Sequence, residues 1–483
     1  MLLWITLVAV VLMGAALTSG IVDRAPLSYP MVFLLLGLVL GGGAFGTIAV
    51  NPRTPALDGL ATVSLSLVLF LDGVMLDATE FRREWRVPTL AAGPVTALTL
   101  LGVALAAHLF LALNWLESLL IGAALASTDP VVVRDVVRDE GIPRSVRRTL
   151  TIEAAFNDII VLPVVLILIA VRQASLNSVI GWLGFLTSLL VLSPVVGLVV
   201  GGVGAWLMGR ADARYSIRRE YQAMYGLGLV LAAYAVAQLV GGDGFLAAFF
   251  AGLAVNLFDV TLCDCFLDYG AVTAEMAMLL TFLLFGAVLS TMLGSVPLLA
   301  GLGLAAATIV VVRPLAIVLV FWRAKMSNTA RAFIGWFGPR GLSSLLLILL
   351  VVQAGLPEGD HLLAITGLVV LVSAIVHGVT ASPLSQLYGR KVAQASPTYP
   401  EEREGDSSGL FSGEATELQR ISPDELAARL ASPKPPVVLD VRTRGEFDSG
   451  DGQIPGSVRV LPDQIAAWAN KADRTRPVVA YCT

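Results

Sequence analysis

Residues 149–171 read TLTIEAAFNDIIVLPVVLILIAV, an apolar run that two acids and an amide interrupt near its start. A helix of about 20 mainly apolar residues crosses the roughly 30 Å of hydrocarbon in a bilayer, and this run is long enough to do so. Glu153 and Asp158 would then lie inside the membrane, where an ionised group is costly unless it is paired or hydrated. The stretch therefore predicts a transmembrane helix that carries a functional site.

The composition of the whole chain also indicates a membrane protein. Hydrophobic residues make up 56% of the 483 residues, charged residues make up only 14%, and the mean hydropathy is +0.81. A soluble domain has about 45–50% apolar and about 25% charged residues. Residues 1–391 hold 22 basic and 22 acidic residues, and residues 392–483 hold 10 and 14. This balance excludes a nucleic-acid-binding protein, and three cysteines favour a reduced protein without a disulfide framework.

Apolar blocks between polar residues predict thirteen transmembrane helices, and hence an all-α polytopic membrane protein. The first block lacks a basic leader and a small-residue cleavage site, so we expect it to be retained. The blocks are 2–20, 30–50, 60–77, 88–113, 117–136, 149–171, 178–208, 221–240, 244–258, 272–291, 296–322, 330–354 and 361–387.

The basic residues between these blocks predict the orientation. With the N-terminus outside, the inside loops hold 18 Lys and Arg, whereas the outside loops hold only Arg53 and Arg172. Cytoplasmic loops of membrane proteins carry the excess of basic residues. We therefore expect an outside N-terminus, a cytoplasmic C-terminus, and a location in the plasma (inner) membrane of a prokaryote.

Six ionisable residues fall inside the predicted spans, away from their ends. Only two of them are basic, so ion pairs that merely hold helices together account for at most two of the four acids. An intramembrane acid without a basic partner indicates a functional site. The six residues are Asp72, Asp129, Glu153, Asp158, Arg313 and Arg340.

Two spans contain helix breakers near the expected middle of the membrane. Asp129 is a good N-cap and Pro130 suits the first helical position, so we expect a new half-helix there. Gly338 and Pro339 predict a helix stop, and Arg340 is placed to offset exposed carbonyl groups. The two spans are seven apart and so run in opposite directions, an arrangement typical of the binding site of secondary transporters. The breakers are Ser127-Thr128-Asp129-Pro130 and Gly338-Pro339-Arg340-Gly341.

The acids of residues 149–171 lie on different faces of their helix. Glu153 and Asn157 are four residues apart and share a face, whereas Asp158 points about 140° away from Glu153. One acid can therefore be neutralised by an arginine while the other faces an aqueous funnel. Protons and a hard cation such as Na⁺, which prefers oxygen ligands, can compete for Asp158, with Thr128, Asp72 and freed backbone carbonyls as further ligands.

Three motifs together resemble a known family. They are Thr128-Asp129-Pro130, Glu153 with Asn157-Asp158, and Arg340-Gly341 followed by Leu342-Ser343-Ser344. Over nearly all of residues 1–391 they are similar to the monovalent cation:proton antiporter family, in its electroneutral sodium/proton branch. The resemblance implies two inverted repeats, a homodimer with a mobile core domain, and alternating access. It further implies a transporter rather than an enzyme, which exchanges Na⁺, Li⁺ or K⁺ for H⁺ and needs no cofactor.

The resemblance also implies roles for single residues. Asp158 would carry the cation and the proton, Thr128 would be a ligand, and Asp72 stands where members often have a glutamate ligand. Asn157, directly before Asp158, is implied to mark one-for-one exchange.

The supporting residues and the ion preference are less determined. Glu153 is implied to pair with either Arg313 or Arg340, and both remain open. Family members can carry a serine ligand directly after the glutamate, where this chain has Ala154. The preference among Na⁺, Li⁺ and K⁺ is therefore open, and a K⁺/H⁺ antiporter regulated by the tail is an alternative.

The tail differs in character from the rest of the chain. Residues 392–417 are predicted to be a polar linker, and residues 418–483 a small α/β module. Within the module we expect a helix from Ser422 to Leu430, a strand over 437–442, a helix over 461–472 and a strand over 477–481.

Short motifs in the tail resemble a rhodanese-like domain. They are Asp440-Val441-Arg442, Glu446-Phe447, residues 452–457 and Tyr481-Cys482. The resemblance implies that Cys482 is the persulfide-carrying nucleophile. The sequence ends one residue later, without the loop that would cradle the thiolate, so we expect a module that binds or regulates without catalysis.

Two alternative functions belong to other classes. A passive cation channel would conduct without proton counterflow, and inverted broken helices argue against it. A membrane-linked sulfurtransferase would depend on Cys482.

Overall fold

The computed structural model describes two compact units, residues 1–415 and 416–483, each considered by itself. The described residues are 9, 13–14, 17, 28–46, 48, 50–76, 89–129, 136, 142–174, 178–258, 260–324, 326–394, 423–432, 435–441, 453–460, 468 and 477–481. Most of the predicted span 2–20, the predicted linker from residue 395 onward, most of the predicted helix 461–472, and Cys482 lie outside them.

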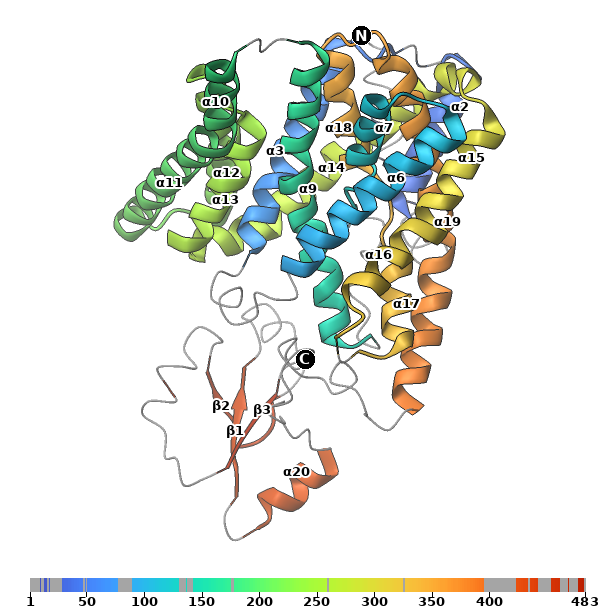
Figure 1. Ribbon diagram of the computed structural model, residues 1–483. Helices are drawn as coiled ribbons and strands as arrows, with labels where there is room; N and C mark the ends of the chain where they lie inside the picture. The colour runs from blue at the N-terminus through green and yellow to red at the C-terminus, as the bar shows by residue number, and fades with distance from the viewer. Residues whose placement is uncertain are drawn as a thin grey trace. The chain divides into compact units, whose positions relative to one another are not determined.

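The first unit is built of helices, most of which pack side by side (Figure 1). Several long helices contain a short π-helical segment, where a turn widens; the label η marks these segments and one short 3₁₀ helix, Leu293–Ser295. The elements are α2 (Tyr29–Leu40), α3 (Pro55–Met75), η1 (Ala91–Val95), α6 (Thr96–Leu111), α7 (Trp115–Ala124), α9 (Arg144–Arg172), α10 (Val179–Thr187), η3 (Ser188–Leu192), α11 (Ser193–Tyr215), α12 (Arg219–Leu239), α13 (Gly244–Phe258), α14 (Val260–Met292), η4 (Leu293–Ser295), α15 (Leu298–Ala306), η5 (Ala307–Val312), α16 (Arg313–Val320), α17 (Asn328–Trp336), α18 (Leu342–Gln353) and α19 (Gly359–Gln394).

The described helices make this a mostly helical membrane protein. Eight segments are long and apolar enough to cross a membrane, and four shorter apolar helices, among them α7 and α18, accompany them. Each segment overlaps one predicted block. The total of thirteen spans stays a prediction, because the block 2–20 lies mostly outside the described residues.

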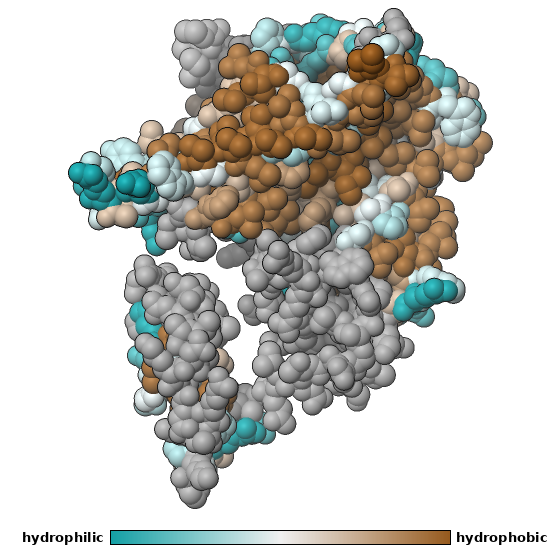
Figure 2. Space-filling view, turned by 60° about the vertical axis from the view of Figure 1, so that its left-hand side comes forward, coloured by the Kyte–Doolittle hydropathy of each residue, from teal (hydrophilic) through white to brown (hydrophobic). Residues whose placement is uncertain are grey.

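The surface of the helical unit is apolar. Figure 2 shows hydrophobic side chains covering much of its visible face. Large apolar side chains are exposed on α6, α11 and the α15–α16 segment, where a soluble protein rarely exposes a large apolar patch. Examples are Leu101, Leu109, Val199, Trp206, Val310 and Leu319. This surface fits contact with lipid tails rather than with water.

Close packing between α3 and α13 positions Asp72, one of the candidate site residues. At the crossing of α3 and α13, a Cβ atom on Gly73 would lie 2.2 Å from the carbonyl oxygen of Phe249, and one on Gly252 would lie 2.0 Å from that of Phe70. Small residues at such crossings let the backbones of transmembrane helices touch. The contact fixes α3 against α13 at the level of Asp72, the neighbour of Gly73.

The second unit contains a small parallel sheet. Its strands are β1 (Val437–Asp440), β2 (Val458–Arg459) and β3 (Val478–Tyr481), in the order β2-β1-β3, and α20 (Pro423–Leu430) precedes them. The predicted helix to Leu430 and the two predicted strands are confirmed. The two-residue β2 was not predicted, because it is too short to show a pattern.

Candidate cation site

The two predicted helix breaks meet inside the helical unit. One break follows α7, which ends at Ala124, and the other is the non-helical segment 337–341 between α17 and α18. The backbone N–H of Asp129 donates to the carbonyl oxygen of Pro339 at 2.9 Å. Non-helical backbone at membrane depth survives only where it is buried in protein or lines a cavity, and each break here supplies a hydrogen-bond partner for the other.

Two charged side chains reach across this crossing to the opposite half-helix. One guanidinium nitrogen of Arg340, Nη1, donates to the carbonyl oxygens of Ala126 and Ser127, both at 2.9 Å. These carbonyls follow the C-terminus of α7, where a helix dipole favours a cation. Asp129 Oδ2 accepts from the backbone N–H of Leu342 at 2.8 Å, at the N-terminus of α18.

Asp129 was expected from the sequence to cap the half-helix that follows it. One of its carboxylate oxygens, Oδ2, accepts a hydrogen bond at the start of α18. Residues 130–135 lie outside the described part of the chain. The capping of that half-helix therefore stays a prediction, whereas the contact with α18 could not be predicted from spacing because it depends on which two helices cross.

Two glycines of the second break leave room for the charges. A Cβ atom on Gly338 would lie 1.8 Å from Arg313 Nε, and one on Gly341 would lie 2.1 Å from Asp129 Oδ2. Distances below 3.0 Å require something to move. Both positions therefore need glycine because charged side chains pack directly on the backbone.

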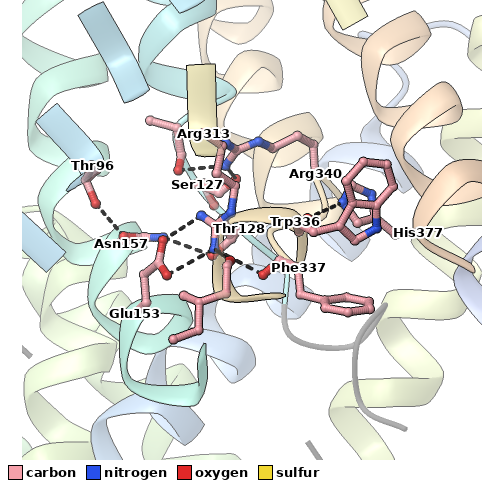
Figure 3. A network of polar contacts seen from close by, with 12 residues as sticks. Thr96, Ser127, Thr128, Glu153, Asn157, Arg313, Trp336, Phe337, Arg340 and His377 are labelled. Carbon is pink, nitrogen blue, oxygen red and sulfur yellow. Dashed lines mark hydrogen bonds and ion pairs between the residues drawn. The ribbon is translucent and has the colours of Figure 1, made fainter. Parts of the chain in front are cut away.

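Glu153 is paired with Arg313, which resolves the alternative that the sequence left open. Arg313 Nη1 donates to Glu153 Oε1 at 2.6 Å and Nη2 donates to Oε2 at 3.0 Å (Figure 3). Arg313 Nη2 also donates to the carbonyl oxygens of Ile334 and Phe337, near the end of α17. The pair is a two-pronged bridge between α9 and α16, with side chains that are 1% and 3% exposed.

Asn157 links three elements around the first break. Its amide nitrogen donates to the hydroxyl of Thr128 at 2.9 Å, and its amide oxygen accepts from the hydroxyl of Thr96 on α6 (Figure 3). The Thr128 hydroxyl thus lies against Asn157. Thr96 was not singled out from the sequence, where it is one of many polar residues in apolar spans.

Asp158, on the same helix as Glu153, is held only by hydroxyl groups among the described residues. Ser127 Oγ donates to its Oδ1 atom, and the Ser343 side chain hydrogen bonds to the same carboxylate. Asp158 is 3% exposed, and no ion pair of the described residues includes it. A buried carboxylate with no basic partner is available for an exchangeable cation or proton.

Asp72 brings a third carboxylate to this region. It is 8% exposed on α3, close enough to Asp158 and Asp129 for their negative charges to repel one another. Such a cluster lowers its free energy by taking up a positive charge. The structure thus gathers Asp72, Asp129, Asp158 and Thr128, with Arg313 and Arg340 engaged elsewhere.

Ser127 and Ser343 are site residues that the sequence analysis did not propose as ligands. Both stood inside quoted motifs, next to Thr128 and Leu342, yet nothing in the sequence showed that their hydroxyls converge on Asp158.

His377 on α19 contacts residues around the second break. Its Nε2 atom lies 2.9 Å from the carbonyl oxygen of Trp336, and its Nδ1 atom lies 3.1 Å from Ser373 Oγ. The same Ser373 hydroxyl accepts from the backbone N–H of Arg340 at 2.8 Å. The histidine therefore supports the second break from behind and takes no part in the carboxylate cluster.

In the second unit, the described residues of the sheet form a small polar cluster. The Tyr481 hydroxyl donates to Asp440 Oδ2 at 2.7 Å and accepts from the backbone N–H of Ile454 at 3.2 Å. The cluster ties the ends of β1 and β3 together. Cys482 follows it directly but lies outside the described residues.

Comparison with known proteins gives relatives for most of the chain. The K⁺/H⁺ antiporter NhaP of Alkalimonas amylolytica is 26% identical over 396 residues, which cover 80% of this chain and 66% of that relative. The K⁺/H⁺ antiporter NhaP2 of Shewanella sp. strain ANA-3 is 27% identical, covering 77% and 65%. The Na⁺/H⁺ antiporter NhaP of Pseudomonas aeruginosa is 27% identical, covering 67% and 80%. The chain thus spans slightly less than two thirds of the length of the first two relatives.

The fold has a solved counterpart, and two family models match the chain. The sodium proton antiporter MjNhaP1 of Methanocaldococcus jannaschii superposes with a TM-score of 0.65 at 20% identity, over 80% of this chain and 98% of that one. Residues 422–483 match the rhodanese-like domain. Residues 8–387 match the transmembrane sodium/hydrogen exchanger, and the chain therefore belongs to the sodium/hydrogen exchanger family.

Proposed function

We propose that the protein is a secondary antiporter that exchanges a monovalent cation for H⁺ at Asp158 by alternating access. The observation that carries the proposal is the contrast on α9 between Glu153, which Arg313 neutralises, and Asp158, which meets only hydroxyl groups among the described residues. Because the carboxylate holds either a cation or a proton, binding of one requires release of the other. One-for-one exchange then moves no net charge.

The other site residues have distinct parts in this proposal. Asp72 and Thr128 contribute oxygen atoms around the cation beside Asp158. The Thr128 hydroxyl accepts one hydrogen bond, from Asn157, and has a second lone pair for the cation. Five further residues hold the two broken helices together and balance the charges around their crossing. They are Asp129, Glu153, Asn157, Arg313 and Arg340.

The transported cation is proposed to be Na⁺ or K⁺. Relatives named for K⁺/H⁺ and for Na⁺/H⁺ exchange both match this chain at 26–27% identity. Alkali cations share a preference for oxygen ligands, so the residues present fit either ion. Li⁺ is a third candidate.

The proposal extends to the organisation of the chain. Residues 1–391 form the membrane domain of a homodimer in the inner membrane, with the N-terminus outside. Residues 392–417 form a linker, and the rhodanese-like residues 418–483 bind or regulate on the cytoplasmic side. The helical content and apolar surface of the first unit support the membrane part.

The test is cation-dependent dissipation of a pH gradient in everted vesicles, assayed separately with Na⁺, Li⁺ and K⁺. Wild-type protein is expected to dissipate the gradient with at least one cation, and Asp158→Asn is expected to abolish this. Glu220→Gln, which removes an exposed acid on α12, is the matched control and is expected to retain activity. Undiminished exchange in Asp158→Asn, or cation conductance without proton movement, would contradict the proposal.

A further inference from the structure

The cation site lacks an oxygen atom at one position on α9. Ala154 is 5% exposed and lies four residues before Asp158, on the same helix face. A hydroxyl group at residue 154 would lie beside the Asp158 carboxylate, where the resemblance drawn from the sequence places a serine ligand. An alkali cation bound at Asp158 therefore needs oxygen atoms from elsewhere.

Two buried hydroxyl groups from other elements reach the same carboxylate. Ser127, in the break after α7, is 0% exposed and donates to Asp158 Oδ1. Ser343, in the first turn of α18, is 5% exposed and hydrogen bonds to the carboxylate as well. They approach from the two broken helices, whose half-helices run in opposite directions in the predicted topology.

The chemistry of a serine hydroxyl allows it to serve both states of the site. The group has one hydrogen to donate and two lone pairs that accept, and its hydrogen rotates freely. With the carboxylate ionised and empty, the hydrogens can point at it. With a cation on the carboxylate, the hydrogens turn away and the lone pairs face the cation.

We propose that the Ser127 and Ser343 hydroxyls are cation ligands beside Asp158 that replace the oxygen missing at residue 154 and set the cation affinity. This rests on the proposed function and deepens it. Because one ligand comes from each broken helix, cation binding joins the two halves of the crossing through Asp158.

Ser344 provides the matched control. It is the next residue on α18 and is 0% exposed, but its hydroxyl donates to the carbonyl oxygen of Ser127 at 3.4 Å instead of to Asp158. Ser344→Ala removes the same atom at the same depth and leaves the hydroxyls around the carboxylate in place.

The experiment uses the full chain in proteoliposomes and in detergent. Ser127→Ala and Ser343→Ala are each expected to raise the KM for the transported cation about tenfold, as loss of one interaction with a charged group does, with kcat within about twofold. The cation-induced rise in Tm, measured in NaCl, LiCl or KCl against choline chloride, is expected to shrink in both. Ser344→Ala is expected to keep both values, and Ala154→Ser is expected to lower the raised KM of Ser343→Ala.

Several results would overturn the ligand assignment. Unchanged KM and unchanged cation-induced Tm shift in both variants would do so, as would a lower Tm with an unaltered shift, which indicates a structural role alone. Equal effects of Ser344→Ala would do the same. These failures differ from failure of the proposed function, which would be absence of exchange by the wild-type protein.

Discussion

Glu153 and Asp158 lie five residues apart on α9, and both are almost fully buried, at 1% and 3% exposure. Their partners differ. Glu153 meets a guanidinium in a two-pronged pair, whereas Asp158 meets the hydroxyls of Ser127 and Ser343. Both side chains are almost fully buried, so it is the partner that separates the neutralised acid from the acid that exchanges its counter-ion in the proposed function.

The difference has an energetic basis. A buried ion pair recovers its desolvation cost only with good geometry and further hydrogen bonds, and Arg313 has both through Glu153 and two carbonyl groups of the α17 end. Such a pair does not exchange its positive charge, because that charge belongs to the Arg313 side chain. Hydroxyl groups stabilise a carboxylate without neutralising it, so Asp158 keeps its demand for a positive charge.

The largest expected effect separates the two acids by stability. Glu153→Gln leaves the buried Arg313 without its counter-charge and is expected to lower the free energy of unfolding by about 3–5 kcal/mol. Asp158→Asn removes a carboxylate that has no basic partner in the described part of the chain and is expected to leave stability unchanged or raised. Unfolding of the purified protein in mixed detergent measures both.

A double variant sharpens this result. Replacing both Glu153 and Arg313 by glutamine is expected to recover most of the loss, because no charge is left unpaired. If Asp158→Asn were as destabilising as Glu153→Gln, the two acids would not differ in the way described.

The next largest effect is expected at Arg340, whose guanidinium joins the two broken helices. Arg340→Gln leaves the carbonyl oxygens of Ala126 and Ser127 without their shared donor. Because bonds to charged groups contribute about 1.5–3 kcal/mol, a loss of about 2–3 kcal/mol is expected in the same unfolding assay, with a lower transport rate. Full stability and full transport in this variant would show that the crossing does not depend on Arg340.

A glycine tests how tightly the Glu153–Arg313 pair is enclosed. Gly338→Ala places a Cβ atom 1.8 Å from Arg313 Nε, and overpacking of this kind costs about 1–3 kcal/mol. Gly228→Ala on α12, where nothing lies within 4 Å of the added atom, is the control and is expected to be neutral or stabilising. Equal melting temperatures for the two variants would contradict the enclosure.

The smallest effect is expected for an ion pair at the surface, which joins an arginine to a carboxylate as the Glu153–Arg313 pair does. Arg53 and Asp360 are 3.0 Å apart but 50% and 44% exposed. Arg53→Ala is expected to cost at most about 1 kcal/mol, because solvent screens the pair. A loss as large as that of Glu153→Gln would mean that burial does not set the strength of these pairs.

Much of the fold could be predicted from the sequence, because each transmembrane helix requires an apolar run that is long enough to cross the membrane. Helix ends were less predictable. The block 272–291 belongs to α14, Val260–Met292, and the block 149–171 to α9, Arg144–Arg172. Both helices start before the apolar run does, in turns whose charged residues look like loop by hydropathy.

The arrangement of site residues along one helix could be predicted from the sequence, whereas the contacts between helices could not. The 3.6-residue period separated the faces of Glu153 and Asp158, and dipole arguments placed Arg340 near carbonyl groups. The choice of Arg313 as the partner of Glu153, the reach of Asp129 to α18, and the convergence of Ser343 on Asp158 depend on which helices touch. Spacing within one segment carries no information about that.

The most direct measurement is proton release on cation binding. NaCl or KCl is added to the purified full chain in weak buffer, with choline chloride as the ionic-strength control, and a pH dye reports released protons. Competition at one carboxylate predicts saturable release that approaches about one proton per chain in the wild-type protein, and none in Asp158→Asn. A cation-induced rise in Tm without proton release, or release undiminished in Asp158→Asn, would contradict it.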